Sequence, residues 1–212
     1  MRYGELYRRM RDGTTAPDVP MWAREVLLEA AAGRISAIRH PLGFLCLPVE
    51  RTGRHGVCVH VWSPDLPASP PATSTWHCHS WDLTSLLLYG RLGNVLARVA
   101  DGRDYRVFEV ASRDDADELK ATSRTVRAVP SDGGTFGAGE VYALPSGVFH
   151  RTVTEGEAAT VALGAERVSG RDLTLGPLDL SGHRSRRVAS PPGETARLAR
   201  RAADLVSLGV SS

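Results

Sequence analysis

The stretch Gly139-Glu-Val-Tyr-Ala-Leu-Pro145-Ser-Gly147-Val-Phe-His150 reads as a strand, a Pro-Gly turn and a second strand that starts near a histidine. About seventy residues earlier, His77-Cys78-His79 places two histidines two positions apart. Side chains at i and i+2 of a β-strand point to the same face, so these two imidazoles are expected side by side. With His150 from a neighbouring strand they would form three legs of a metal site, while Cys78 should point away from it.

The rest of the chain surrounds these segments with short apolar stretches separated by Gly, Pro and Asp. Many short strands of this kind are typical of a sandwich or a barrel. The expected strands cover residues 43–48, 57–62, 84–89, 94–99, 105–110, 124–129, 140–144, 149–154 and 159–164.

Helices are expected at both ends of the chain. Asp18 and Pro20 suit the start of a helix that Gly33 ends, and a shorter helix over 3–10 is a further expectation. A closing helix is expected over 194–207, with its arginines on a solvated face. The acidic residues 112–122 favour a short helix or an exposed loop, and 179–193 look irregular and basic. The predicted organisation is a helical segment 1–36, a β-barrel 37–180, and a basic linker with a helix over 181–212.

Length and composition limit the classes of protein to which this chain can belong. The 212 residues, 42% hydrophobic and 24% charged, are ordinary for one globular domain, and a net charge of +2 argues against nucleic acid as the main partner. Three cysteines without a CxxC spacing favour a reducing cytoplasm over a disulfide framework. No signal peptide or membrane span is expected.

The spacing resembles that of the cupin superfamily. The second cupin signature is matched without a gap by Gly139, Pro145, Gly147 and His150, and the first is matched at His77, His79 and Gly90. The glutamate of the first signature is absent, because its two candidate positions hold Leu83 and Thr84. The resemblance implies a mainly β fold, the double-stranded β-helix or jelly-roll barrel of cupins, here with N- and C-terminal helices. Cupins often dimerise through sheet edges, so the resemblance also allows a homodimer.

A cupin with three histidine ligands is similar to the thiol dioxygenases, such as cysteine dioxygenase. The likeness extends to Arg151, which follows the third histidine as in that family. It implies a metal site of His77, His79 and His150 that binds Fe(II) and oxidises a chelated thiol with O2. The family's Ser-x-His-x-Tyr motif is missing, since the corresponding strand 160–165 reads Thr-Val-Ala-Leu-Gly-Ala. The pocket is therefore expected to be rebuilt.

Two points about the expected metal site are open: which metal it binds, and whether the Asp82 carboxylate is a fourth ligand. Asp82 could join the three histidines if its strand bulges, although simple alternation points it away from them. Fe(II) is the first expectation because O2 chemistry needs a metal that exchanges electrons, with Ni(II) or Mn(II) as alternatives. Zinc would favour chemistry without redox change.

Other pocket residues are suggested by strand parity. In residues 56–62 the valines alternate with Cys58, His60 and Trp62. If the valines face the helices, Cys58 and Trp62 could bind substrate and His60 could act as a base; otherwise His60 is partly exposed on a sheet face. Cys46 is read as a small core residue.

Three further candidates come from other strands. Trp81 has the parity of the histidines, together with Leu83, Ser85, Leu87 and Tyr89, and is expected to be a pocket wall or simply core. Tyr142 is a candidate proton donor. Arg98 is a candidate for holding a substrate carboxylate, although an arginine is by default exposed.

The leading hypothesis is a mononuclear, metal-dependent cupin oxygenase. Its partners would be O2 and a small substrate that chelates the metal, best represented by a cysteine-derived thiol. The alternatives are an oxygen-independent, metal-dependent isomerase or lyase, and a non-catalytic cupin that binds a metabolite. Absence of a helix-turn-helix pattern argues against a DNA-binding role.

Overall fold

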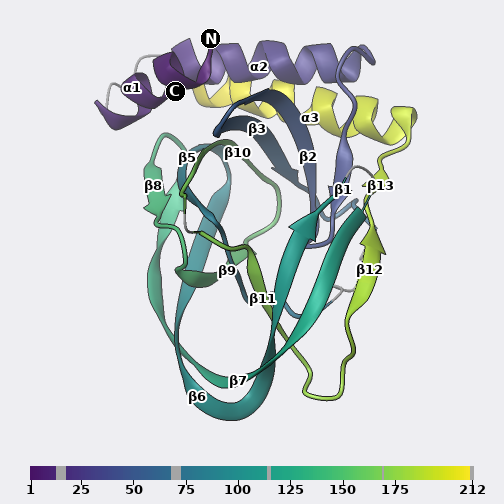
Figure 1. Ribbon diagram of the computed structural model, residues 1–212. Helices are drawn as coiled ribbons and strands as arrows, with labels where there is room; N and C mark the ends of the chain where they lie inside the picture. The colour runs from purple at the N-terminus through teal and green to yellow at the C-terminus, as the bar shows by residue number, and fades with distance from the viewer. Residues whose placement is uncertain (13–17, 68–72, 114–115, 169, 211–212) are drawn as a thin grey trace.

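The computed structural model describes residues 1–12, 18–67, 73–113, 116–168 and 170–210. Two antiparallel sheets face each other, as Figure 1 shows. A cluster of apolar side chains lies between them. The first sheet has, in spatial order, β13 (Val188–Ala189), β1 (Ile38–His40), β2 (Phe44–Thr52), β3 (His55–Trp62), β10 (Ala158–Glu166), β5 (Trp81–Tyr89) and β8 (Val141–Leu144). The second has β11 (Leu173–Gly176), β4 (His77–Cys78), β9 (Phe149–Thr154), β6 (Arg91–Ser112), β7 (Ala116–Gly137) and β12 (His183–Arg186).

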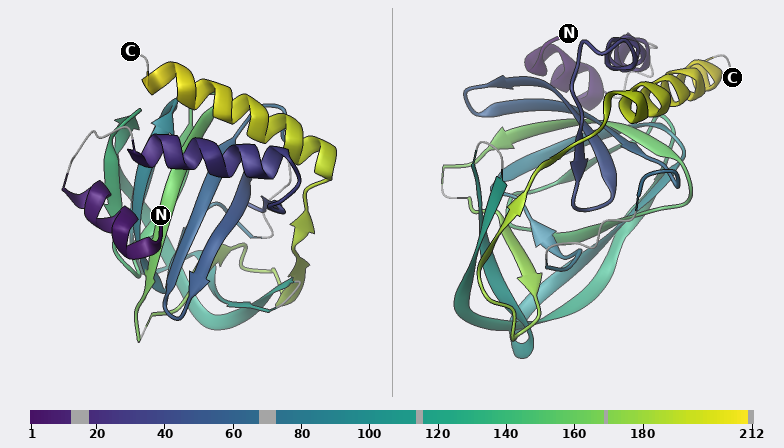
Figure 2. Two further views of the ribbon diagram at one scale, coloured as in Figure 1. Left: turned by 90° about the horizontal axis from the view of Figure 1, so that it is seen from above. Right: turned by 90° about the vertical axis from the view of Figure 1, so that its right-hand side faces the viewer.

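Three helices lie across the outer face of the first sheet (Figure 2). They are α1 (Tyr3–Arg11), α2 (Asp18–Ala31) and α3 (Pro192–Val210). Each has an apolar stripe at helical spacing, such as Leu6 and Met10 on α1 or Leu198, Ala202 and Val206 on α3, and these stripes are buried. None of the helices in the described residues has both the length and the apolar character that a membrane span requires.

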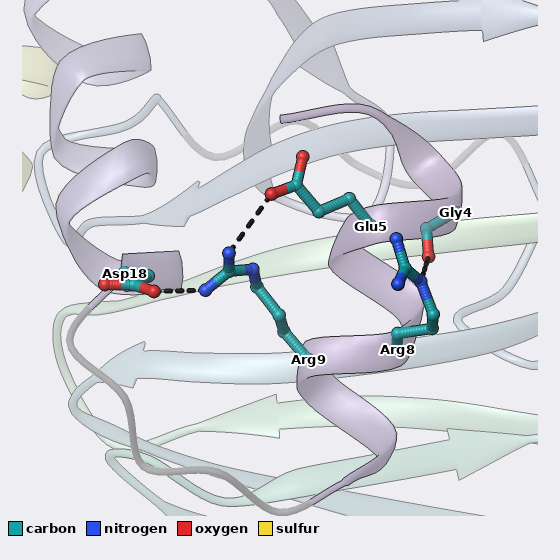
Figure 3. Close-up of polar contacts among 5 residues, drawn as sticks. All are labelled: Gly4, Glu5, Arg8, Arg9 and Asp18. Carbon is teal, nitrogen blue, oxygen red and sulfur yellow. Dashed lines mark hydrogen bonds and ion pairs between the residues drawn. The ribbon is translucent and has the colours of Figure 1, made fainter.

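Polar contacts at the surface join the first two helices (Figure 3). Arg9 of α1 pairs with Glu5 one turn earlier, at 3.2 Å, and with Asp18 at the start of α2. Arg8 donates to the Gly4 carbonyl along the same helix. Because the side chains of Arg9, Glu5 and Asp18 are all exposed, these ion pairs contribute little to stability. The buried apolar stripes hold the helices in place.

The interior is divided into clusters by strand alternation. Val57, Val59 and Val61 of β3 are fully or almost fully buried against the helices, as the valine pattern predicts. Burial of this kind stabilises the fold by about 1.5–3 kcal/mol for each valine. The opposite face of the first sheet meets the second sheet in a cluster that includes Trp62, Leu83, Leu92 and Leu144. A further cluster, with Trp76, Cys78 and Phe149, covers the other face of the second sheet.

These observations confirm the predicted mainly β, two-sheet fold with terminal helices. The predicted strands 94–99 and 105–110 are parts of one 22-residue strand, β6, which bends at irregularities in its pairing with β7. The division into segments 1–36, 37–180 and 181–212 stays a prediction.

Two segments differ from their predicted conformation. Residues 112–122 are not a helix or loop where they are described, since Asp117–Ala121 pair with Phe108–Ser112 at the end of β6 and extend the hairpin. The segment 179–193, expected to be irregular, contains β12 and β13, which pair with β7 and β1. In the first case the hydrogen bonds come from the neighbouring end of β6, and in the second they come from strands far away in the chain. Local composition reveals neither pairing.

Candidate metal centre

Strand register brings the three histidines together. His77 on β4 lies directly opposite His150 on β9. The ring centroid of His79 is 4.9 Å from that of His77 and 5.0 Å from that of His150, and the His77 and His150 centroids are 4.3 Å apart. One ring nitrogen from each histidine lies within 4.8 Å of the others.

Backbone carbonyls select which nitrogen of two histidines faces the centre. Nδ1 of His77 is 3.0 Å from the Thr75 carbonyl oxygen, and Nδ1 of His150 is 3.0 Å from that of Val148. Because a carbonyl can only accept, each Nδ1 must carry the hydrogen, which leaves Nε2 with a free lone pair. This is the arrangement that orients a metal-ligating histidine.

Burial keeps these imidazoles in the neutral form that binds metals. It lowers the pKa of His77 to about 3, with a further lowering by His150. The pKa of His79 also lies well below its ordinary value, because of burial and the nearby His77 and His150. Burial likewise lowers the pKa of His150. A site that is neutral before binding releases no proton when an ion enters near pH 7.

The donor set fits a transition-metal ion. Bonds of about 2.0–2.1 Å from each nitrogen to a shared ion would place the nitrogens about 3 Å apart, so small side-chain rotations from the observed spread suffice. Three neutral imidazoles match the nitrogen-ligand preference of Fe, Ni, Cu and Zn. The residues present therefore fit the metal that the cupin resemblance implies.

The turn before His150 is bonded directly to His79. The Gly147 N–H donates to the His79 carbonyl at 2.9 Å, and the Ser146 hydroxyl donates to the same carbonyl at 3.1 Å. Gly147 has a φ of +80°, a conformation that glycine adopts without strain. The Pro-Ser-Gly turn thus fixes both the ligand that follows it and one that precedes it by about seventy residues.

Asp82 supports this turn and does not join the ligands. Its Oδ1 accepts the Ser146 N–H at 2.9 Å, and its Oδ2 is held by the Arg167 guanidinium. These bonds, chiefly the one to Arg167, lower the pKa of the Asp82 carboxyl. In the described part of the chain, the candidate ligand cluster at this position contains the three histidines and no carboxylate. The open question about Asp82 is therefore answered in favour of simple alternation.

Aromatic side chains surround the histidines and the interior beside them. Trp81 stacks on His79 with a centroid distance of 4.0 Å. Phe44 packs against His60 at 4.5 Å and Trp62 at 5.0 Å. Cys58, His60 and Trp62 thus face away from the helices, toward the second sheet, as one of the two interpretations of β3 expects. Trp62 also lines a cavity of about 240 Å³ with Ser63, Pro64 and Thr154, a set that does not include the three histidines.

The remaining candidates are placed differently. Tyr142 is buried in the barrel interior and stacks on Phe136. Burial raises the pKa of Tyr142, while Ser85 and Asn94 act in the opposite direction. Arg98 is exposed on β6, opposite Val129 of β7. The catalytic roles of His60 and Tyr142 and the substrate contacts of Cys58, Trp62, Trp81 and Arg98 stay predictions.

Strand parity misplaces Tyr89. It packs in the cluster that faces the helices and not, as expected, in the interior with Leu83 and Leu87. The reason is an irregularity in the pairing of β10 with β5, where Ala159 faces Tyr89 but Thr160 faces Leu87. One extra residue at such a bulge reverses the faces of the side chains beyond it.

His40 is a member of the interior that the sequence pattern did not reveal. Its ring stacks on Phe44 at 4.2 Å, and its Nδ1 accepts the Leu42 N–H at 3.2 Å, so the hydrogen of the neutral ring is on Nε2. Burial, His60 and Arg187 lower its pKa to about 3. The strand that carries His40 has three residues and is followed by a Pro-Leu-Gly turn, so its sequence has too little alternation to assign its side chains to a face of the sheet. The one available signal is Pro41, which favours an extended backbone at His40.

Buried polar groups without partners also face the interior. Ser85 Oγ, Thr160 Oγ1 and Asn94 Nδ2 are inaccessible and have no partner in good hydrogen-bond geometry, although Ser85 and Asn94 lie close enough to the Tyr142 hydroxyl to affect its pKa. Asn94 Oδ1, in contrast, accepts from Thr152 at 3.2 Å. These three groups add polar atoms to an otherwise apolar interior.

Comparison with known proteins found no match by sequence and solved structures of low similarity. No protein-family model matches the sequence, and no curated protein matches it. A cupin-2 domain protein from Shewanella frigidimarina is 16% identical over 56% of this chain and 79% of its own, with a TM-score of 0.28. A hydroquinone 1,2-dioxygenase, PnpCD, crystallised with Cd2+ and 4-hydroxybenzonitrile, is 11% identical over 57% of this chain and 63% of its own, with a TM-score of 0.33.

A third structure is hydroquinone 1,2-dioxygenase from Sphingomonas sp. TTNP3, bound to 4-hydroxybenzoate. It is 15% identical over 55% of this chain and 62% of its own, with a TM-score of 0.30. The chain therefore spans less than two thirds of either dioxygenase chain. Its two antiparallel sheets, its three convergent histidines and its Gly-Pro-Gly-His turn are features that the resemblance to cupins implies.

Proposed function

We propose that this protein is a mononuclear, metal-dependent oxygenase that acts on a small substrate able to chelate the ion. The observation that carries the proposal is the cluster of His77, His79 and His150, three neutral nitrogen ligands with no carboxylate in the described cluster. A bound Fe(II) ion would supply electron exchange with O2 and would lower the pKa of a coordinated thiol.

The neutral ligand set favours an anionic substrate. Three imidazoles leave the charge of a divalent ion uncompensated, and a substrate with two donor atoms, at least one of them negative, would balance it. The best candidate is a thiol with a neighbouring amine or carboxylate. Oxidation to the sulfinate, R–SH + O2 → R–SO2H, places both oxygen atoms in the product and needs no further reductant.

The surrounding residues have distinct tasks in this proposal. Trp81 holds the His79 ring by stacking, and the Gly147 and Ser146 bonds hold its backbone. Phe44 and Trp62 keep bulk water from the interior beside the site. His40, whose neutral ring carries its hydrogen on Nε2, can donate a hydrogen bond to a substrate atom, and His60 can accept a proton.

The test joins metal analysis to oxygen uptake. The protein is purified without O2 and assayed for iron, nickel, manganese and zinc, alongside His150→Ala. The proposal expects about one equivalent of a redox-active metal, lost in the variant, and O2 uptake with small thiols that yields a sulfinate. Turnover of a substrate without O2 in a zinc-loaded protein would instead support an isomerase or lyase. A protein that binds none of these metals would contradict the proposal and favour a metabolite-binding cupin.

A further inference from the structure

A second cluster of metal-binding side chains lies on the first sheet. The thiols of Cys46 and Cys58 and one ring nitrogen of His60 lie within 4.8 Å of one another, and all three residues are partly buried. Leu45, Leu47, Val57 and Val59 alternate with them and face the helices, so the three polar side chains point to the barrel interior. His77 and His150 belong to the other sheet, so the two clusters are separate groups of residues.

Register argues that the two thiols are not poised for a disulfide. Cys46 on β2 lies directly opposite His60 on β3, and Cys58 lies opposite Pro48. The cysteines are therefore diagonal neighbours, for which the Cα atoms are about 7–8 Å apart. A disulfide needs a Cα separation of about 4.4–6.8 Å, so closing one would require the strands to move. Both cysteines are free.

The donor types favour a thiophilic ion. Two thiolates and one imidazole, with a fourth position left open, form a known kind of Zn2+ site. A carboxylate is missing from this cluster within the described residues, which disfavours Mg2+ and Ca2+. The pKa of Cys58 is lowered to about 5, by the Cys46 thiol above all and then by His60, against the raising effect of burial. Cys46 has a raised pKa, because Cys58 and burial favour its protonated form, so an ion must displace that proton.

We propose that Cys46, Cys58 and His60 form a second metal site, which binds a thiophilic divalent ion of the Zn2+ type with its fourth position open to the barrel interior. The site goes beyond the oxygenase proposal and does not depend on it, because it needs no reaction at the three histidines. An ion bound here would occupy a nitrogen of His60, so His60 could accept a proton in the neighbouring chemistry only while this second site is empty.

Co2+ is a suitable probe because a Co2+–thiolate bond gives a charge-transfer absorption that Co2+ on histidines lacks. The full chain, stripped of metal and kept reduced, is titrated with Co2+. The wild type is expected to bind two equivalents and to show the thiolate absorption. His150→Ala should keep this absorption and bind one equivalent fewer, which separates the second site from the three-histidine site.

Variants of the second site should give the opposite pattern. Cys58→Ser and Cys46→Ser should lose the thiolate absorption and weaken Co2+ binding there by more than about 100-fold, beyond what loss of a supporting group costs. Cys78→Ser is the matched control for the thiolate absorption, since Cys78 is buried in the cluster with Trp76 and Phe149 and should leave that absorption unchanged. Near-ultraviolet circular dichroism checks that each variant is folded.

The wild-type titration alone can refute the proposal, whatever the variants do. A folded, reduced wild type that binds Co2+ without thiolate absorption would overturn it. So would an absorption that survives in both Cys46→Ser and Cys58→Ser, or one that disappears in Cys78→Ser alone. Failure of Co2+ to bind the three histidines, with the thiolate absorption present, would contradict the oxygenase proposal and leave the second site standing.

Discussion

His79 and Gly147 are joined backbone to backbone, with the Gly147 N–H donating to the His79 carbonyl at 2.9 Å. This bond links the two sequence segments that carry the histidines. A histidine of the cluster from one segment is therefore positioned by the turn that precedes the histidine of the other. Asp82 completes the link by accepting the Ser146 N–H of the same turn.

Asp82→Ala should weaken metal binding at the histidines without abolishing it. The Ser146 N–H would lose its acceptor and the turn its anchor, so the affinity should fall by about 10–100-fold with the stoichiometry unchanged. Asp82→Asn, which keeps an oxygen for Ser146, should have a smaller effect. The measurement is a competition titration against a chelator, with Asp65→Ala, which removes an exposed ion pair with Arg197, as the control. Complete loss of metal from folded Asp82→Ala would instead identify Asp82 as a ligand.

His150→Ala should remove the metal from the three-histidine site. Its Nε2 is free for coordination while its Nδ1 is held by the Val148 carbonyl, and two remaining histidines cannot replace it. Elemental analysis after dialysis should show loss of about one equivalent. The control is His183→Ala, on β12 and outside the cluster, which should retain the wild-type content. Equal metal content in both variants would contradict the assignment.

Gly90→Ala should destabilise the protein far more than Gly156→Ala. Both glycines have positive φ, +85° and +76°, which costs an alanine about 1–2 kcal/mol. A Cβ at Gly90 would also lie 2.2 Å from the Glu157 carbonyl oxygen and 2.8 Å from the Ala158 Cα, whereas one at Gly156 would meet nothing within 4 Å. The expected loss at Gly90 is about 3 kcal/mol or more. Urea unfolding of the two variants measures the difference, and equal losses would refute the steric explanation.

His40→Asn should make stability less sensitive to acid. The pKa of His40 is about 3 in the folded protein and near 6.5 in the unfolded chain, so between these values only the unfolded chain binds this proton. The contribution of His40 to the free energy of unfolding therefore decreases as the pH falls below about 6.5, and it is constant above that value. Asn removes the proton and can still accept the Leu42 N–H.

The measurement is the free energy of unfolding in urea between about pH 5 and pH 7.5. The slope for His40→Asn should be shallower than that of the wild type by up to about 1.4 kcal/mol per pH unit. Near the upper end the difference between the two proteins should become constant, which provides an internal control. Parallel curves over the whole range would show that His40 is protonated to the same degree in both states.

Several features of the site follow from the sequence alone. The i and i+2 positions of His77 and His79, the direction of Cys78 away from them, and the alternation of β3 are all local, because the side-chain period of a strand is two. The Gly-Pro-Gly spacing before His150 likewise depends on turn geometry within a few residues. These local rules also suffice for the mainly β fold and for the terminal helices.

The tertiary structure alone decided which distant groups meet. Asp82 is taken out of the ligand set by Arg167 and Ser146, and Cys46 is brought against Cys58 and His60, because register between strands depends on pairings that no local pattern encodes. A bulge on β5 turns Tyr89 outward, and β13 exists because it pairs with β1. The sequence determined which residues can serve as ligands, and the packing of the two sheets determined which of them share a site.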